Sequence, residues 1–303
     1  MILRHDHMRS DPAYRAALRA AGLDSVAAVF GRIDGRVVAW SRTTDSIYVP
    51  GANGVGFYVK RYWYPTWRHR LRSMLRGTFL GAHRGLAEFR ALTHMRNMGI
   101  AAVRPIACGC RRVGHFVNAC FLITEEVPDA PNLTTFAQQI TRGTVRLDQP
   151  ERAALAGQLA TQLADMHALG FAHGRLFWRN VLVRRAVAGG PEFFLLDADP
   201  PKRLERMGRG GRWWLWELAK LAVSAAPFTT RTERVRFVRA YFKLARLTPD
   251  AKAQLHEIDR LAHRWRRHEA QRIRMNRRFD EWNRRLDAEE RQLAAAGGAE
   301  LGG

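Results

Sequence analysis

Residues 173–199, HGRLFWRNVLVRRAVAGGPEFFLLDAD, decide how this chain is interpreted. A polar stretch that ends at Asn180 comes before a short apolar segment, Val181–Val183. A Gly-Gly-Pro sequence then separates that segment from a second apolar run, Phe193–Leu196. This pattern predicts two strands joined by a turn. Asp197 ends the second run, and a carboxylate at the buried end of a strand more often binds a ligand than faces water.

The first part of this stretch resembles the catalytic loop of protein kinases, H-R-D-x-x-x-x-N, whose aspartate accepts the proton of the substrate hydroxyl and whose asparagine holds a magnesium ion. In that register His173 opens the motif and Asn180 closes it, but Arg175 stands in the position of the aspartate. Asp197 occupies the place of the magnesium-binding aspartate of the D-F-G motif. The resemblance implies a metal-binding pair, a structural His173, and no ordinary base.

Phosphoryl transfer depends mainly on positioning and charge neutralisation, so a kinase also needs a lysine on the nucleotide phosphates and a helix glutamate that holds this lysine. Lys60, one of only five lysines, ends the apolar segment Phe57–Val59, much as the lysine ends the V-A-I-K motif. Glu88 follows in a segment whose apolar residues recur at helical spacing. We expect Lys60 and Glu88 to form an ion pair.

Residues 119–124, ACFLIT, predict a buried strand, and the segment after it suits a hinge whose backbone contacts adenine through Glu125 and Val127. A glycine-rich phosphate loop is not evident, because the connection between the first two expected strands, SRTTDS at 41–46, contains no glycine. Backbone amides can still contact phosphate there, although close approach is harder without glycine.

Together with residues 57–89, these motifs resemble the lipopolysaccharide kinase family of Kdo and inner-core heptose kinases, over roughly residues 35–245. The resemblance implies an α+β, protein-kinase-like bilobal fold. Its small N-lobe would hold an antiparallel sheet and one helix, and its larger C-lobe would be mainly helical. It further implies that ATP and Mg²⁺ are the cofactors and that the γ-phosphate of ATP goes to a sugar hydroxyl of the lipopolysaccharide core.

Carried over by position, the resemblance assigns nucleotide binding to Lys60, Glu88, Glu125 and Val127, and magnesium binding to Asn180 and Asp197. It also implies that this phosphotransferase works at the cytoplasmic face of the inner membrane. We therefore expect a cytoplasmic protein, with peripheral attachment to that face as an option. The sequence has no apolar run of the ~18 residues that a membrane-spanning helix needs. Its first residues lack the apolar core of a secretory signal.

Arg175 decides how much activity to expect. A guanidinium is effectively always protonated and cannot accept a proton, so it cannot serve as general base, a role worth ~10² to 10⁴ in rate. Three interpretations remain open. Arg175 stabilises phosphate charge while Asp199 or water accepts the proton, or it pairs with Asp197 and blocks magnesium. In the third, the chain is a pseudokinase that binds nucleotide and an anionic membrane or envelope partner as a regulatory module.

The chain is expected to divide into a helical extension (1–34, with a helix from Pro12), an N-lobe (35–127), a C-lobe (128–265) and a basic helical tail (266–303) that ends in a disordered Gly/Ala segment. Residues 212–225 predict the core helix of the C-lobe. Related kinases often place an aspartate early in that helix to brace the catalytic loop. Here tryptophans fill that turn and Glu217 is its only carboxylate, which we interpret as a second departure from the kinase pattern.

The net charge of +22 points to an anionic partner, although high-GC coding bias also enriches arginine. One basic cluster, 61–76, is interleaved with aromatic residues, and a second, 264–285, carries the helical stripe Phe279, Trp282 and Leu286. These clusters fit the lipopolysaccharide core or another anionic glycolipid, or an anionic inner-membrane surface. Packing of the second stripe on the C-lobe is an equal alternative. Single-stranded nucleic acid would also suit such clusters, but the kinase motifs make it the less favoured partner.

The three cysteines, Cys108, Cys110 and Cys120, lie in one expected hairpin and are too few for a zinc cage. Free thiols in a cytosolic protein are the simplest interpretation.

Overall fold

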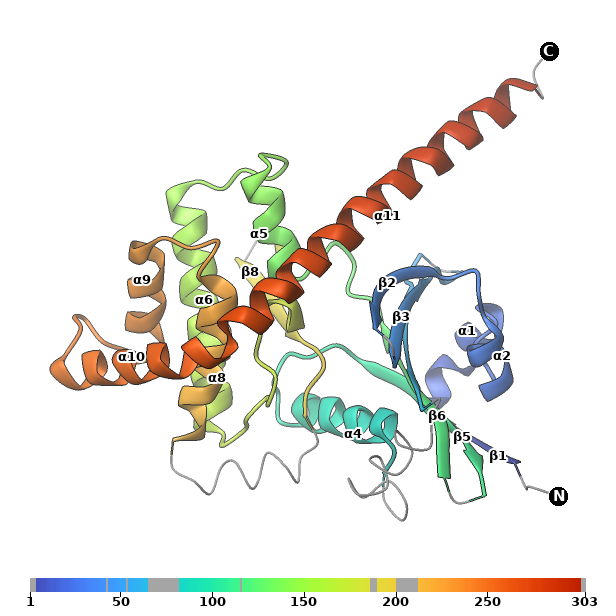
Figure 1. Cartoon of the computed structure of the whole chain (residues 1–303), viewed down its shortest axis with the longest axis horizontal. Helices are drawn as coiled ribbons and strands as arrows, with labels where there is room; N and C mark the ends of the chain where they lie inside the picture. The colour runs from blue at the N-terminus through green and yellow to red at the C-terminus, as the bar shows by residue number, and fades with distance from the viewer. Residues whose placement is uncertain are drawn as a thin grey trace.

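A computed structural model of the chain describes residues 4–41, 43–52, 54–64, 82–114, 116–185, 190–199 and 212–300, except for the side chains of 290, 291 and 293–300. The described residues form two lobes, an N-lobe built on a sheet and a mainly helical C-lobe (Figure 1). This confirms the predicted α+β architecture.

The N-lobe sheet is antiparallel, with six strands in the order β1-β5-β6-β4-β3-β2. The strands are β1 (Arg4–Ser10), β2 (Arg36–Ser41), β3 (Thr44–Val49), β4 (Phe57–Trp63), β5 (Pro105–Val113) and β6 (Phe116–Glu125). Burial alternates along β4 from Phe57 to Arg61, so that Val59 packs into the core while Lys60 lies on the opposite face, between Ser46 and Leu122 in register. The sheet thus fixes the direction of the lysine side chain.

Residues 4–10 differ from the expected helical extension, because they form edge strand β1 and pair with β5 along its whole length. Their sequence, RHDHMRS, has one strongly apolar residue and no alternation that would predict a strand. The expected helix from Pro12 is present as η1 (Pro12–Tyr14) and α1 (Arg15–Ala20), and α2 (Val26–Gly31) follows. Leu18, Leu23 and Val29 from this segment pack into the sheet core.

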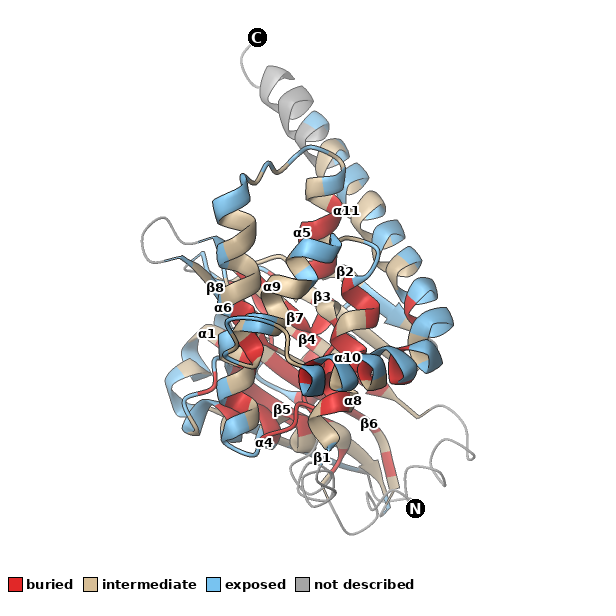
Figure 2. Cartoon of the chain, turned by 90° about the vertical axis from the view of Figure 1, so that its left-hand side faces the viewer, coloured by how far each residue is buried: buried red, intermediate tan, exposed pale blue. Residues whose placement is uncertain are grey.

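One further N-lobe helix, α4 (Arg84–Asn97), carries Glu88 on its buried face. His83 caps the helix by accepting a hydrogen bond from the Leu86 backbone N–H at 3.2 Å. Burial lowers the pKa of His83 to about 4, which keeps its ring neutral and able to accept. Leu92 and Met95 belong to the core that contains the C-lobe helices, and α4 also contacts β5 and β6, so α4 packs against both lobes. Figure 2 marks the buried residues along the chain in red.

The C-lobe contains the helices α5 (Leu133–Thr141), α6 (Gln149–Ala168), α8 (Trp213–Ala225), α9 (Arg231–Tyr241), α10 (Pro249–Ala262) and α11 (Arg266–Glu300), with the 3₁₀ turns η3 (Trp178–Asn180) and η4 (His263–Trp265). The predicted hairpin is present as β7 (Val181–Arg185) and β8 (Pro191–Leu195). Val103 N–H donates to Leu195 O at 3.0 Å, which links the residues after α4 to β8. The segment that follows β8 is therefore held close to α4.

Helix α11 extends across the molecule and contacts β2 as well as α5 and α8 (Figure 1). It continues to Glu300, where the sequence predicted disorder from Ala294, since alanine favours helix strongly. No helix among the described residues is both long enough and apolar enough to cross a bilayer. The three cysteines are buried free thiols on β5 and β6.

Gly85 is expected to control how closely α4 packs on the sheet. A Cβ at this position would lie far inside contact distance of the Phe121 carbonyl oxygen on β6, which is backbone and cannot rotate away. Gly85→Ala should therefore destabilise the chain by about 1–3 kcal/mol. The control is Gly157→Ala in α6, where the added methyl meets no atom within 4 Å and should stabilise by about 0.5–1 kcal/mol. Chemical denaturation of both variants tests this, and equal effects would contradict it.

Candidate active site

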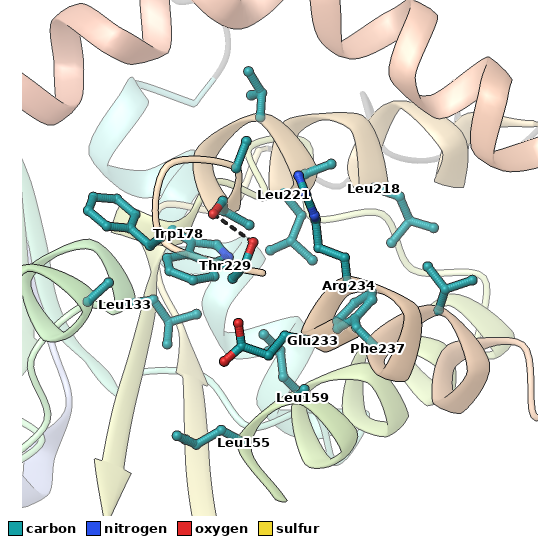
Figure 3. Close-up of a pocket in the computed structure, with 18 of the residues that line it drawn as sticks. Leu133, Leu155, Leu159, Trp178, Leu218, Leu221, Thr229, Glu233, Arg234 and Phe237 are labelled. Atoms are coloured by element: carbon teal, nitrogen blue, oxygen red, sulfur yellow. Dashed lines mark hydrogen bonds between the residues drawn. The ribbon is translucent and has the colours of Figure 1, made fainter. Parts of the chain in front are cut away.

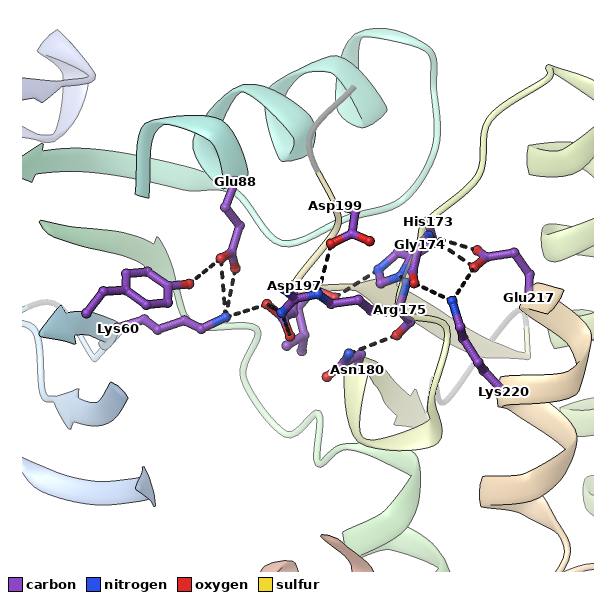
Figure 4. A network of polar contacts seen from close by, with 12 residues as sticks. Lys60, Glu88, His173, Gly174, Arg175, Asn180, Asp197, Asp199, Glu217 and Lys220 are labelled. Carbon is purple, nitrogen blue, oxygen red and sulfur yellow. Dashed lines mark hydrogen bonds and ion pairs between the residues drawn. The ribbon is translucent and has the colours of Figure 1, made fainter. Parts of the chain in front are cut away.

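Lys60 and Glu88 form the predicted ion pair. The Lys60 Nζ atom lies 3.0 Å from Glu88 Oε1 and 3.3 Å from Oε2 (Figure 4). Glu88 is buried, and the hydroxyl of Tyr62 donates a second hydrogen bond to its Oε2. Two donors therefore satisfy this carboxylate, and β4 and α4 fix the position of the ammonium group.

Asp197 lies between the two lobes and accepts a hydrogen bond from Lys60 Nζ at 2.5 Å. Its backbone has a φ of 62°, a left-handed conformation that is uncommon for a residue other than glycine. Such conformations persist where the surrounding structure enforces them, often at functional sites. Burial alone would raise the pKa of Asp197, but the charges of Lys60 and Arg175 hold it well below its usual range.

Arg175 joins the two aspartates that follow β8. Its Nη1 donates to both carboxylate oxygens of Asp197 at 3.1 Å, and its Nε donates to Asp199 Oδ1 at 2.9 Å (Figure 4). Burial works against the charge of Arg175, yet the two carboxylates raise its pKa. The Arg175–Asp197 pairing that one of the three interpretations requires is thus present.

Gly174 makes room for Asp199. A Cβ at position 174 would come within 2.7 Å of Asp199 Cγ, and the φ of 81° at Gly174 also favours glycine. Asp199 itself is buried. Gly174 and Arg175 therefore both accommodate Asp199. Gly174 leaves space for its side chain, and Arg175 forms an ion pair with its carboxylate.

His173 and Asn180 connect the catalytic loop to the segment after β8. His173 Nδ1 accepts from the Arg175 N–H at 3.2 Å, so its Nε2 carries the proton and donates to Leu196 O at 2.9 Å. Burial lowers the pKa of His173 to about 4, which keeps the ring neutral. Asn180 Nδ2 donates to Arg175 O at 2.8 Å, which leaves Oδ1 as its acceptor atom.

Glu217 and Lys220, on α8, brace the catalytic loop, which the sequence analysis missed. Both oxygens of Glu217 lie 3.1 Å from the Gly174 N–H, and Lys220 Nζ donates to Gly174 O at 2.5 Å. Burial raises the pKa of Glu217 to about 7. Glu217 departs from the usual aspartate in residue type, yet its carboxylate still supports the loop. Two charged residues three positions apart in an otherwise apolar helix were the available signal.

Glu125 ends β6 at the predicted hinge. Its carboxylate accepts from the Tyr14 hydroxyl at 2.7 Å, and the carboxylate of Glu126 accepts from the Gly56 N–H at 2.8 Å. Val127 packs against the C-lobe core. Because N-lobe groups bind both carboxylates, contacts to adenine at this hinge would fall to the backbone.

The first predicted basic cluster, residues 61–76, does not consist of surface residues alone. Arg61 is buried, donates to Asp45 Oδ1 at 2.6 Å and donates to Arg32 O at 2.7 Å. Trp63 Nε1 donates to the other oxygen of Asp45 at 2.7 Å. Arg61 therefore stabilises the N-lobe and is not available to a ligand, and Trp63 binds the same carboxylate. Residues 65–81, which hold the rest of the cluster, lie outside the described residues.

An apolar cavity of about 590 Å³ lies within the C-lobe, apart from the Lys60–Asp197 pair. Helices α5, α6, α8, α9 and α10 line it, largely with leucine, alanine and aromatic side chains (Figure 3). Glu233 lies at this cavity and pairs with Arg152 at 3.0 Å. The cavity and the polar site belong to different parts of the structure.

The model of one known protein family matches most of the chain. Residues 22–241 match the model of the family described as "Lipopolysaccharide kinase (Kdo/WaaP) family". The chain belongs to this family. The matched segment includes the Lys60–Glu88 pair, the loop at His173 and Asp197.

The chain is 29% identical over 174 residues to a 3-deoxy-D-manno-octulosonic acid kinase of Pasteurella multocida (strain Pm70), which covers 57% of this chain and 66% of the relative. It is also 29% identical over 122 residues to a kinase of the same name from Vibrio vulnificus (strain CMCP6), covering 40% of this chain and 42% of the relative. The chain thus matches less than two thirds of the length of these relatives.

A solved structure described as "WaaP in complex with acyl carrier protein" has the same fold, with a TM-score of 0.55 and 21% identity. The likeness covers 88% of this chain and 99% of that chain. The protein-kinase-like fold expected from the sequence is therefore confirmed.

Members of a kinase family are expected to use ATP and a divalent metal, and the donor atoms here fit a metal that arrives with the nucleotide. Mg²⁺ prefers oxygen ligands and is usually held by one or two carboxylates together with substrate phosphates. Asp197 and the Oδ1 atom of Asn180 are such donors. Within the described ranges there is no group of three or more His, Cys, Asp or Glu side chains that could hold a metal by themselves.

The stability of the chain should depend on the ionisation of Glu217. Its native pKa of about 7 lies above its ordinary value of 4.5, so the native state favours the protonated form. The stability that this group provides is fully present below pH 4.5 and is lost as the pH rises through 7, by at most about 3 kcal/mol.

Urea unfolding of the chain and of Glu217→Gln between pH 4.5 and 8 tests this expectation. The amide does not ionise, so the unmodified chain should lose stability relative to the variant across that window. A stability difference that stays constant with pH would contradict the assignment.

Proposed function

We propose that this chain is an ATP-dependent phosphotransferase that phosphorylates a sugar hydroxyl of the lipopolysaccharide core or of a related anionic glycolipid. The observation that carries the proposal is the convergence of Lys60, Glu88 and Asp197, joined by contacts of 2.5–3.3 Å at the junction of the lobes. Family membership and two relatives named as Kdo kinases support the substrate class.

Each residue has a role in this proposal. Lys60, held by Glu88, binds the nucleotide phosphates, and the backbone at Glu125 and Val127 contacts adenine. Asn180 Oδ1 and Asp197 would hold Mg²⁺, which neutralises phosphate charge when it is bound with ATP. His173, Glu217 and Lys220 keep the catalytic loop in position.

Arg175 takes a different role from the aspartate that it replaces. Its Nη1 is suited to stabilise charge on the transferred phosphoryl group, as an arginine finger does. The acceptor hydroxyl oxygen attacks the γ-phosphorus, the bond to the β–γ bridging oxygen breaks, and the hydroxyl proton passes to Asp199 or to water. The absence of a strong base is tolerable because positioning and charge neutralisation provide most of the rate enhancement.

A pseudokinase that binds nucleotide and an anionic envelope partner is the second candidate. It is favoured by one observation, the contact of Arg175 Nη1 with both carboxylate oxygens of Asp197. In this alternative Arg175 keeps its hold on Asp197 after nucleotide binds, and Mg²⁺ does not increase nucleotide affinity.

Thermal unfolding with ATP, with and without Mg²⁺, tests the nucleotide site. We expect a magnesium-dependent stabilisation that is lost in Lys60→Ala and in Asp197→Ala. Lys252→Ala removes an exposed lysine on α10 and should keep the full effect. The absence of stabilisation under all conditions would refute both candidates, and stabilisation without magnesium dependence would favour the pseudokinase.

Transfer of labelled γ-phosphate to purified core oligosaccharide tests turnover. Because removal of an arginine finger costs about 10³ or more in rate, Arg175→Ala should lower kcat by that order while ATP still binds. A rate in Arg175→Ala or Arg175→Asp equal to or above that of the unmodified chain would show that Arg175 does not assist transfer.

We also propose that the solvent face of α11 contacts an anionic membrane surface. Arg267, Arg274, Arg278 and Arg285 are exposed and recur on one helical face, near the exposed Trp282. Charge reversal of Arg274, Arg278 and Arg285 to Glu should abolish sedimentation with phosphatidylglycerol vesicles.

The matched control reverses three exposed arginines elsewhere, Arg15, Arg231 and Arg246, and so makes the same change in net charge. It should retain most vesicle binding. Equal loss in both triple variants would mean that net charge, and not α11, governs binding.

A further inference from the structure

The face of α11 that packs on the protein is polar. Glu269, Asn276, Asp280 and Asp287 recur at helical spacing on one side, opposite the exposed arginines. This polar seam differs from the stripe of Phe279, Trp282 and Leu286 that the sequence suggested, in which Trp282 is 45% exposed. The four seam residues contact elements of both lobes.

We propose that α11 is an interlobe strap that sets the separation between strand β2 and the catalytic loop, with Glu269 and Asp287 as its anchors. The importance of that separation for catalysis depends on the proposed function, because β2 leads into the β2–β3 connection expected to cover the nucleotide. The mechanical link itself does not depend on that function.

The C-lobe anchor lies beside the metal-binding asparagine. Glu269 is buried and pairs with Arg179, the residue before Asn180. The guanidinium of Arg179 also stacks 4.1 Å from the centre of the Phe177 ring. A buried carboxylate that is paired in this way is costly to separate, so this end of the strap is firm.

The middle of the seam attaches α11 to α5. Asn276 Nδ2 donates to Thr135 Oγ1 at 3.0 Å, and Thr135 Oγ1 donates to Asp280 Oδ1 at 3.4 Å. Gln138, one turn further along α5, lies 3.5 Å from Ile273 O. These contacts fix the direction in which the helix leaves the C-lobe.

The N-lobe anchor is the ion pair between Arg36, at the start of β2, and Asp287. Strand β2 is an edge strand of the sheet, and α11 packs beside it. The two side chains are 33% and 36% exposed, so the pair is weak and sensitive to salt. Between Glu269 and Asp287 the helix spans about 27 Å as a continuous rod, with one firm end and one adjustable end.

Spin labels on the two lobes test the strap without any need for turnover. Ile33→Cys in the N-lobe and Leu169→Cys in the C-lobe replace exposed residues. Burial raises the pKa of the native thiols, to about 12 for Cys108 and about 11 for Cys120, so labelling should be confined to the introduced cysteines.

Asp287→Arg should broaden and lengthen the measured distance distribution, and the swap of Arg36→Asp with Asp287→Arg should restore it. Glu289→Arg, the same charge change at an exposed position on α11, should leave it unaltered. An unchanged distribution in Asp287→Arg, or a swap that fails to restore it, would overturn the proposal.

Nucleotide affinity provides a second readout that a merely stabilising contact would not move. Asp287→Arg should weaken binding of a fluorescent ATP analogue about threefold to fivefold, and the charge swap should recover it. If the unmodified chain binds no nucleotide, the proposed function fails while the distance measurement still decides the strap. A normal affinity in Asp287→Arg despite an altered distance would overturn the link between strap and site.

Discussion

The Asp197 carboxylate, shared by a cation from each lobe, is the interaction on which the arrangement of this site depends. Lys60 reaches it from β4 and Arg175 reaches it from the catalytic loop. A carboxylate that is mostly removed from water is costly unless opposite charges and hydrogen bonds compensate its lost hydration. Two backbone features position this carboxylate between the two cations. One is the left-handed conformation of Asp197, and the other is the hydrogen-bonded link between β8 and the residues after α4.

The departures from the kinase pattern compensate one another. Gly174 leaves the space that Asp199 fills, Asp199 balances part of the charge of Arg175, and Glu217 with Lys220 binds both polar groups of the Gly174 peptide. Replacing only one of these residues would introduce a clash or remove one partner from a buried charged group. The residues of this loop therefore depend on one another for space and charge balance. This distinguishes the loop from a kinase loop in which only the aspartate has been replaced.

Apolar runs on either side of a Gly-Gly-Pro turn predicted the β7–β8 hairpin, whereas the resemblance to kinase motifs predicted the two lobes and the Lys60–Glu88 pair. The misses share a physical cause. Strand β1 is held by backbone pairing with β5, Arg61 by a distant Asp45, and α11 by a polar seam. Polar contacts between residues far apart in sequence leave no periodic signal, so only the fold reveals which charged residues are surface and which are structural.

The position of Arg175 also links metal binding to nucleotide binding under the proposed function. Lys60 and Arg175 both bind Asp197 at 2.5–3.1 Å, so a cation that needs its oxygens must compete with two fixed positive charges. Nucleotide phosphates carry negative charge and attract the same two side chains. Their arrival would draw Lys60 and Arg175 from the carboxylate and release oxygens for Mg²⁺. An aspartate at position 175 would impose no such order, since it would attract the metal before nucleotide binds. Under the proposed function, Arg175 would thus make nucleotide binding a requirement for assembling the metal site.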